Sequence, residues 1–144
     1  MASRSELREK IMIILYQIEM YNKNKFSYNV DDVIHENINI SNEFVNSIVY
    51  GTLEKQSELD TIANKYLKKW TIDRIDNLGS VILRMAIYEI KYTNTPDIVV
   101  INEAIELAKK YSDEGSRKMI NAVLDKIVNE WFYGEKIYYC NNIK

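Results

Sequence analysis

The sequence predicts an all-α protein that folds as a single domain. Glycine and proline are scarce, with four glycines and one proline in 144 residues, which disfavours a fold with many tight turns. Apolar residues recur at steps of three and four along most of the chain, the spacing that places side chains on one helix face. A chain of this length suits one domain with its own hydrophobic core.

The first predicted helix follows Ser3 and extends to about Tyr21. Ser3 and Glu6 form a capping-box pattern, which marks a helix start. A shorter helix is expected from Tyr28 to Glu36, and Ser41 is expected to cap the helix after it. The sequence therefore begins with one long and one short amphipathic helix.

Residues 42–69 carry the longest helical pattern, interrupted at Gly51. A lone glycine in a helix costs about 1 kcal/mol relative to alanine, so a bend or a close contact is expected there. One long helix and two shorter helices both fit this pattern. The next helix ends by Asn94, because the residue before Pro96 disfavours helical geometry. It is apolar around much of its circumference, which predicts a central position in the bundle.

Two further amphipathic helices are predicted, over residues 99–111 and from about residue 113 to Trp131. Ser112 and Asp113 are both candidate N-caps of the second of these. The buried face of the first is expected to contain Ile101, Ala104, Ile105, Ala108 and Tyr111. Four residues are predicted to lie in the core, namely Leu83, Ile87, Ile105 and Leu124.

The helical domain is predicted to span residues 1–133, followed by a C-terminal tail over residues 134–144. The tail is rich in aromatic residues. It can pack on the body, meet a second copy of the chain, or remain disordered, as chain ends often do.

Composition favours a cytoplasmic protein without catalytic or metal chemistry. No apolar run approaches the ~20 residues that a membrane span needs, and no signal segment is apparent. Cys140 is the single cysteine and cannot form an internal disulfide. His35 is the only histidine and has no evident metal-binding or nucleophilic partner. No catalytic residue, metal site, cofactor or membrane contact is therefore predicted.

Four segments occur in an order that is typical of one family. They are Arg8-Glu9 with Leu15-Tyr16-Gln17, Ile82 to Glu89 before Pro96, Ile101 to Lys109, and Asn121 to Lys126. Together they resemble the NusB family of bacterial transcription antitermination factors. The resemblance implies a bundle of about seven helices in two packed halves. It also implies binding of boxA RNA together with the ribosomal protein NusE, within the transcription elongation complex during rRNA transcription.

The resemblance also implies two binding surfaces. The expected RNA surface combines the starts of the first and last helices and contains Arg4, Arg8, Tyr16, Arg117, Lys118 and Met119. Cations there hold phosphates, and aromatic rings stack on unpaired bases. The expected surface for NusE contains Asp73, Asp76, Gly79 and Glu89. The family usually has an acidic residue where Gly79 stands, a phenylalanine where Met119 stands, and a denser arginine run at the N-terminus.

The net charge of −2 separates two interpretations. Domains that bind nucleic acid unaided are usually basic, so the cations here must be localised or supplemented by a basic partner. The alternative is a helical protein-interaction module, possibly homodimeric, that has lost RNA binding. A contiguous basic patch in the folded protein favours the first interpretation.

Overall fold

Helices account for nearly all of the regular structure in the computed structural model, which describes residues 2–132. No strand occurs within that range. The helices are α1 (Arg4–Lys23), α2 (Val30–Asn37), α3 (Glu43–Glu54), α4 (Gln56–Tyr66), α5 (Asn77–Tyr92), α6 (Asp97–Tyr111) and α7 (Glu114–Phe132). The predicted all-α class is confirmed. The proposed tail over residues 134–144, with Cys140, lies outside the described residues.

Side-chain caps fix the helix starts. Ser3 caps α1 as predicted, and its hydroxyl oxygen accepts a hydrogen bond from the Glu6 N–H at 3.1 Å. The start of α3 is capped by Asn42 and not by Ser41, because the Asn42 side-chain oxygen accepts from the Val45 N–H at 3.0 Å. At the start of α7, the Asp113 carboxylate accepts from the Ser116 N–H at 2.7 Å, which decides between the two candidate caps.

The long pattern over residues 42–69 forms two helices, α3 and α4, which meet at Lys55. Gly51 lies one turn before this break and allows another helix to pack closely against α3. A Cβ atom built on Gly51 would lie 2.1 Å from the Tyr88 ring. The absence of a side chain at residue 51 therefore lets the Tyr88 ring of α5 lie against the α3 backbone.

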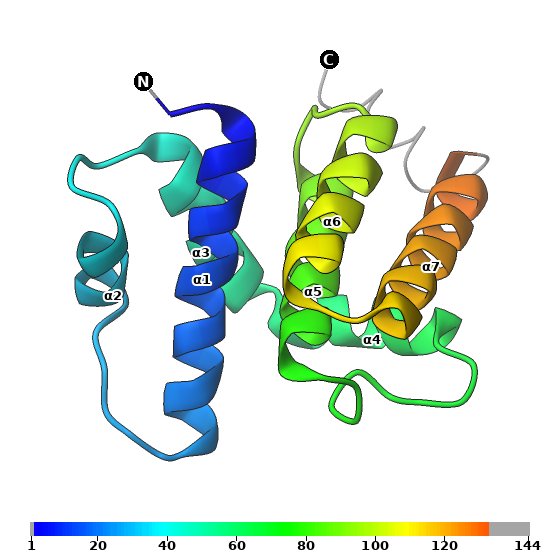
Figure 1. Ribbon diagram of the computed structural model, residues 1–144, viewed down its shortest axis with the longest axis horizontal. Helices are drawn as coiled ribbons and strands as arrows, with labels where there is room; N and C mark the ends of the chain where they lie inside the picture. Colours follow the sequence, from blue (N-terminus) through cyan, green and yellow to red (C-terminus); the bar gives the residue numbers. More distant parts are fainter. Residues whose placement is uncertain (1, 133–144) are drawn as a thin grey trace.

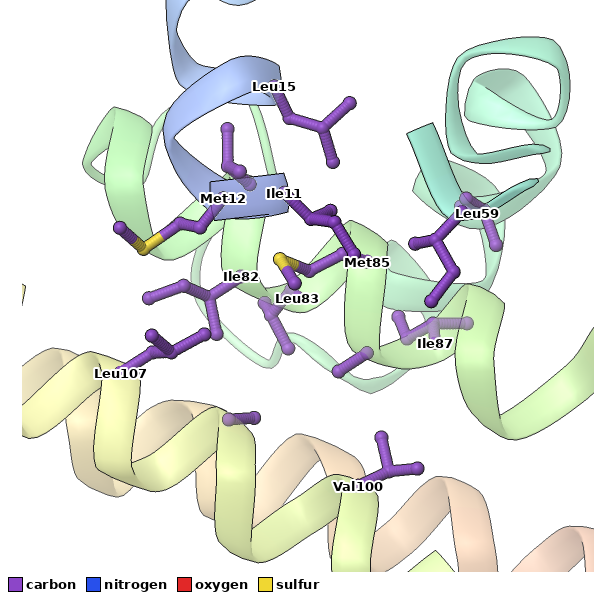
Figure 2. Packing of buried hydrophobic residues seen from close by; sticks show 14 of the residues in the cluster. Ile11, Met12, Leu15, Leu59, Ile82, Leu83, Met85, Ile87, Val100 and Leu107 are labelled. Atoms are coloured by element: carbon purple, nitrogen blue, oxygen red, sulfur yellow. The ribbon is translucent and has the colours of Figure 1, made fainter. Parts of the chain in front are cut away.

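Helix α5 is the centre of the bundle, as its apolar sequence predicted. It packs against α1, α3, α4, α6 and α7, and all but one of the residues from Gly79 to Ile90 are buried. Figure 2 shows Ile82 and Met85 of α5 among side chains of α1 and Leu107 of α6. The bundle has two halves, with α1 to α3 on one side and α4 to α7 on the other (Figure 1).

The buried face of α6 is rotated relative to the predicted face. Val100, Ala104, Leu107 and Ala108 are buried, whereas Ile105 is only half-buried. Ile105 and Leu107 both fit a helical repeat, and the choice between them depends on where α5 and α7 pack against α6. The predicted burial of Ile105 is therefore wrong. Leu83, Ile87 and Leu124 are fully buried, as predicted.

Truncating Leu124 to alanine should lower the free energy of unfolding by about 2–5 kcal/mol, because it leaves a cavity at a fully buried position. Ile105→Ala is the matched control, and its loss should be clearly smaller because Ile105 is partly hydrated in the native state. Urea denaturation of both variants measures the difference. Equal losses would mean that the Leu124 face of α7 is not core.

Candidate nucleic-acid interface

The basic residues predicted to form one RNA surface lie at two ends of the bundle. Figure 1 shows the start of α1 at the top and the start of α7 at the bottom, beyond α5 and α6. The Ser116 hydroxyl donates to Asp76 at 2.8 Å, which ties the start of α7 to the start of α5. The start of α5 adjoins the end of α1, where Lys23 bonds Asn77. Arg4 and Lys118 are therefore not on one patch.

Arg8 has a structural position that the sequence pattern did not reveal. Its side chain is buried, and its Nε donates to the Glu89 carboxylate at 2.9 Å while a second nitrogen contacts the other carboxylate oxygen. Glu103 lies 3.6 Å from the same guanidinium. The hydrogen bond with Glu89 raises the pKa of Arg8. The prediction that Arg8 belongs to an RNA surface and Glu89 to a separate partner surface is not supported by their positions, because the structure pairs them with each other inside the bundle.

The other residues predicted on α1 are accessible to different degrees. Arg4 is exposed, and its guanidinium carbon lies 3.8 Å from the centre of the Phe44 ring of α3. Tyr16 is half-buried and packs against the hydrophobic core. At the start of α1, Arg4 is thus exposed but already contacts the Phe44 ring, while Arg8 over the same ring is buried.

The predicted protein-partner residues also separate into two groups. Asp73 and Asp76 are exposed, and Gly79 and Glu89 are buried. The Asp76 carboxylate caps α5 by accepting from the Gly79 N–H at 2.9 Å. A Cβ atom at residue 79 would lie 2.6 Å from that carboxylate, so the glycine fits beneath the cap. Of these four residues, Asp73 has an exposed carboxylate that does not join two helices in the described part of the chain.

A surface groove runs along the first turns of α7, opposite the segment that joins α4 to α5. It consists of two hollows of about 360 Å³ and about 470 Å³ that share Trp70 and Met119. We call it the α7 groove; its lining is Tyr66 to Trp70, Arg74 to Asp76, Asp113, Gly115, Ser116, Met119, Ala122, Val123 and Lys126. Each hollow has the volume of a typical small-ligand site, which is ~300–1,000 Å³.

Cations gather at one end of the α7 groove. Lys68, Lys69 and Lys126 line that end and are exposed. None of the three forms an ion pair with any residue in the described part of the chain. The pKa of Lys126 is lowered, first by a side-chain hydrogen bond with Lys68 and to a lesser degree by desolvation and by the positive charge of Lys68. This end of the groove therefore favours an anionic ligand.

Two predicted RNA residues border the α7 groove from the α7 side. Met119 lines both hollows. Lys118 is one helical turn from Gly115 and Ala122, which places it at the rim. Its side chain is 73% exposed and its ammonium lies 3.4 Å from Glu114, an exposed contact of small energy. Arg117 is less exposed and lies 3.6 Å from the same carboxylate.

Sequence reasoning missed Trp70 and the lysines before it. The signal was present, because Lys68-Lys69-Trp70 places two cations next to a large aromatic residue. The segment lies at the end of a helical pattern, and helical periodicity says nothing about the role of residues beyond the last turn. Basic residues next to an aromatic residue are typical of surfaces that bind single-stranded RNA.

Among the residues that the structure describes, no three His, Cys, Asp or Glu side chains are grouped so that they could bind a metal ion. No helix between residues 2 and 132 is both long enough and apolar enough to span a membrane.

Comparison with known proteins identifies the relatives of this chain. Residues 5–129 match the NusB family. The chain is 38% identical to the transcription antitermination protein NusB of Macrococcus caseolyticus over 128 residues, covering 88% of this chain and 96% of that protein.

Solved structures show the same relationship. NusB of T. maritima has a TM-score of 0.80 and 29% identity, over 90% of this chain and 92% of that one. A complex of the antitermination factors NusB and NusE with double-stranded RNA has a TM-score of 0.74 and 25% identity, over 88% of this chain and 96% of that one.

Replacing Arg8 with methionine should lower the free energy of unfolding by about 3–5 kcal/mol, because it leaves the buried Glu89 carboxylate without its partner. Exchanging Glu89 for leucine in the same chain should restore most of the loss. Thermal and urea denaturation measure both effects. Arg4→Met, which removes an exposed contact, is the control and should cost about 1 kcal/mol or less. A stable, unperturbed Arg8→Met variant would contradict the buried pair.

Proposed function

Because this chain belongs to the NusB family, we propose that it is an RNA-binding transcription antitermination factor that acts without catalysis in the cytoplasm. It binds boxA RNA together with the ribosomal protein NusE during rRNA transcription, as part of the transcription elongation complex. The single observation that carries the RNA role onto this chain is the α7 groove, which combines unpaired lysines with exposed aromatic surface.

The α7 groove suits single-stranded RNA better than a duplex. Proteins recognise single strands by stacking unpaired bases on aromatic side chains while cations hold the phosphates. Trp70 and Met119 supply apolar surface within the groove, and Lys118 stands at its rim. Of the residues expected to contact RNA, Met119 and Lys118 are included in the proposed RNA surface. Arg117 belongs to the same turn of α7 and is less exposed.

The α7 groove also favours this role over the alternative of an interaction module that has lost RNA binding. Such a module has no need for neighbouring lysines whose charges are not matched by carboxylates. Lys68, Lys69 and Lys126 line one end of the groove and have no ion-pair partner among residues 2–132, so an anion bound there would meet three positive charges. A polyanionic ligand accounts for this grouping of cations.

The partner surface proposed for NusE lies at the start of α5, beside the end of α1. Asp73 is exposed there, and Lys23 at the end of α1 bonds Asn77 at the start of α5. A basic protein docked at Asp73 would lie near the Asp76 end of the α7 groove. It could therefore extend the phosphate-binding surface where this chain is acidic.

Reversing the charge of Lys118 to glutamate should weaken binding of boxA RNA and reduce the slope of log K against log salt by about one, because one phosphate contact is lost. The matched control is Arg4→Glu at the opposite end of the bundle, which should leave both quantities unchanged. Fluorescence anisotropy at several salt concentrations measures them. If Arg4→Glu weakens binding and Lys118→Glu does not, the RNA lies on the start of α1 instead.

NusE should tighten RNA binding by this chain, since a protein of net charge −2 repels a polyanion at long range and a basic partner offsets that repulsion. By thermodynamic linkage, RNA must then tighten the contact between the two proteins by the same factor. Titrations of RNA with and without saturating NusE, and of NusE with and without saturating RNA, all at one ionic strength, measure the two affinity changes. Equal RNA affinity for the isolated chain and for the pair would rule out partner assistance.

A further inference from the structure

Trp70 is exposed in a segment whose backbone is held in place. Its side chain is 56% exposed, whereas Trp131, the other tryptophan, is buried. Leu67 and Ile72 on either side of it are buried. The Ile72 N–H donates to the Asn64 side chain at 2.7 Å, and the Arg74 N–H donates to the Thr71 carbonyl at 2.9 Å. The exposed indole ring is therefore displayed by an anchored backbone.

The surroundings of this ring match the chemistry of a nucleotide. Trp70, in the segment between α4 and α5, and Met119 of α7 both line both hollows of the α7 groove. A base inserted between them would contact an aromatic face on one side and a polarisable thioether on the other. At the lysine end, Lys68 and Lys126 are side by side and have no carboxylate partner among the residues described.

Building on the RNA-binding role proposed above, we propose that Trp70 is the residue on which an RNA base stacks, and that Lys68 and Lys126 together hold an adjacent phosphate. The groove has a direction, because two carboxylates, Asp76 and Asp113, outnumber the single cation Arg74 in the lining of the end away from this lysine pair. Phosphates are repelled there, so the RNA backbone passes over the lysine end and the base occupies the middle of the groove. Met119 forms the wall opposite the indole.

The direct test uses tryptophan fluorescence of the full chain. In a Trp131→Phe background, Trp70 is the only tryptophan, and short single-stranded boxA RNA should quench its emission on binding. Trp70→Ala should weaken binding of that RNA by about 5- to 150-fold, the measured range for losing one base–aromatic stack. Trp70→Phe should retain most of the affinity. Phe26→Ala is the control, because Phe26 is a similarly exposed aromatic residue outside the groove.

The phosphate contact is tested separately from the stack. Exchanging Lys68 and Lys126 for glutamine should reduce the slope of log K against log salt by about one to two, and the quenching at saturation should remain. Lys25→Gln, an exposed lysine in the connection between α1 and α2, should leave the slope unchanged.

The outcomes distinguish this inference from the proposed function. If the wild-type chain binds RNA, with or without NusE, but Trp70→Ala binds equally well and Trp70 emission does not change, the stacking role is wrong and the RNA-binding function stands. If the wild-type chain binds no RNA under either condition, both fail. If quenching depends on protein concentration and needs no RNA, the groove receives a second copy of the chain and the inference is overturned.

Discussion

The bundle depends on bringing two charged residues of α5 into its interior. Arg84 and Glu89 are both buried, and charges removed from water need partners. Helix α1 supplies one of each sign: Glu19 lies 2.7 Å from Arg84, and Arg8 pairs with Glu89. Asp60 of α4 adds a second contact to Arg84 at 2.7 Å. Because the signs alternate, a parallel arrangement of α1 and α5 would place like charges together, so these pairs specify the antiparallel one.

This use of arginine explains how a nearly neutral protein can retain a basic groove. The buried arginines stabilise helix orientation, and several surface lysines contact carboxylates, as Lys110 does with Glu9 at 2.9 Å and Lys65 with Glu130 at 2.8 Å. Lys68 and Lys126 have no such partner within residues 2–132, and they lie at one groove. The net charge of the sequence therefore says little about the charge that a ligand meets at that surface.

Helical periodicity was sufficient to predict the class, most helix boundaries and the central position of α5. It could not settle the buried face of α6, because Ile105 and Leu107 fit the repeat equally well. It also could not assign Arg8, since an arginine at the edge of an apolar stripe looks the same whether it faces solvent or a buried glutamate. Trp70 was missed for a different reason: the role proposed for it depends on its lining the same groove as Met119, and these two residues belong to segments far apart in sequence.

The carboxylate of Asp76 has a consequence for how a ligand enters the α7 groove. It accepts hydrogen bonds from the Gly79 N–H, from the Ser116 hydroxyl and, at 3.3 Å, from the Ser112 hydroxyl. One side chain, at the end of the segment that joins α4 to α5, thus connects the start of α5 to the start of α7, and the segment and α7 form the two sides of the groove. In the RNA complex proposed above, Asp76 would hold the protein side of the groove in place before the ligand arrives, so the entropy lost on association would come mainly from the RNA. Such a groove would bind without a prior rearrangement of these two elements.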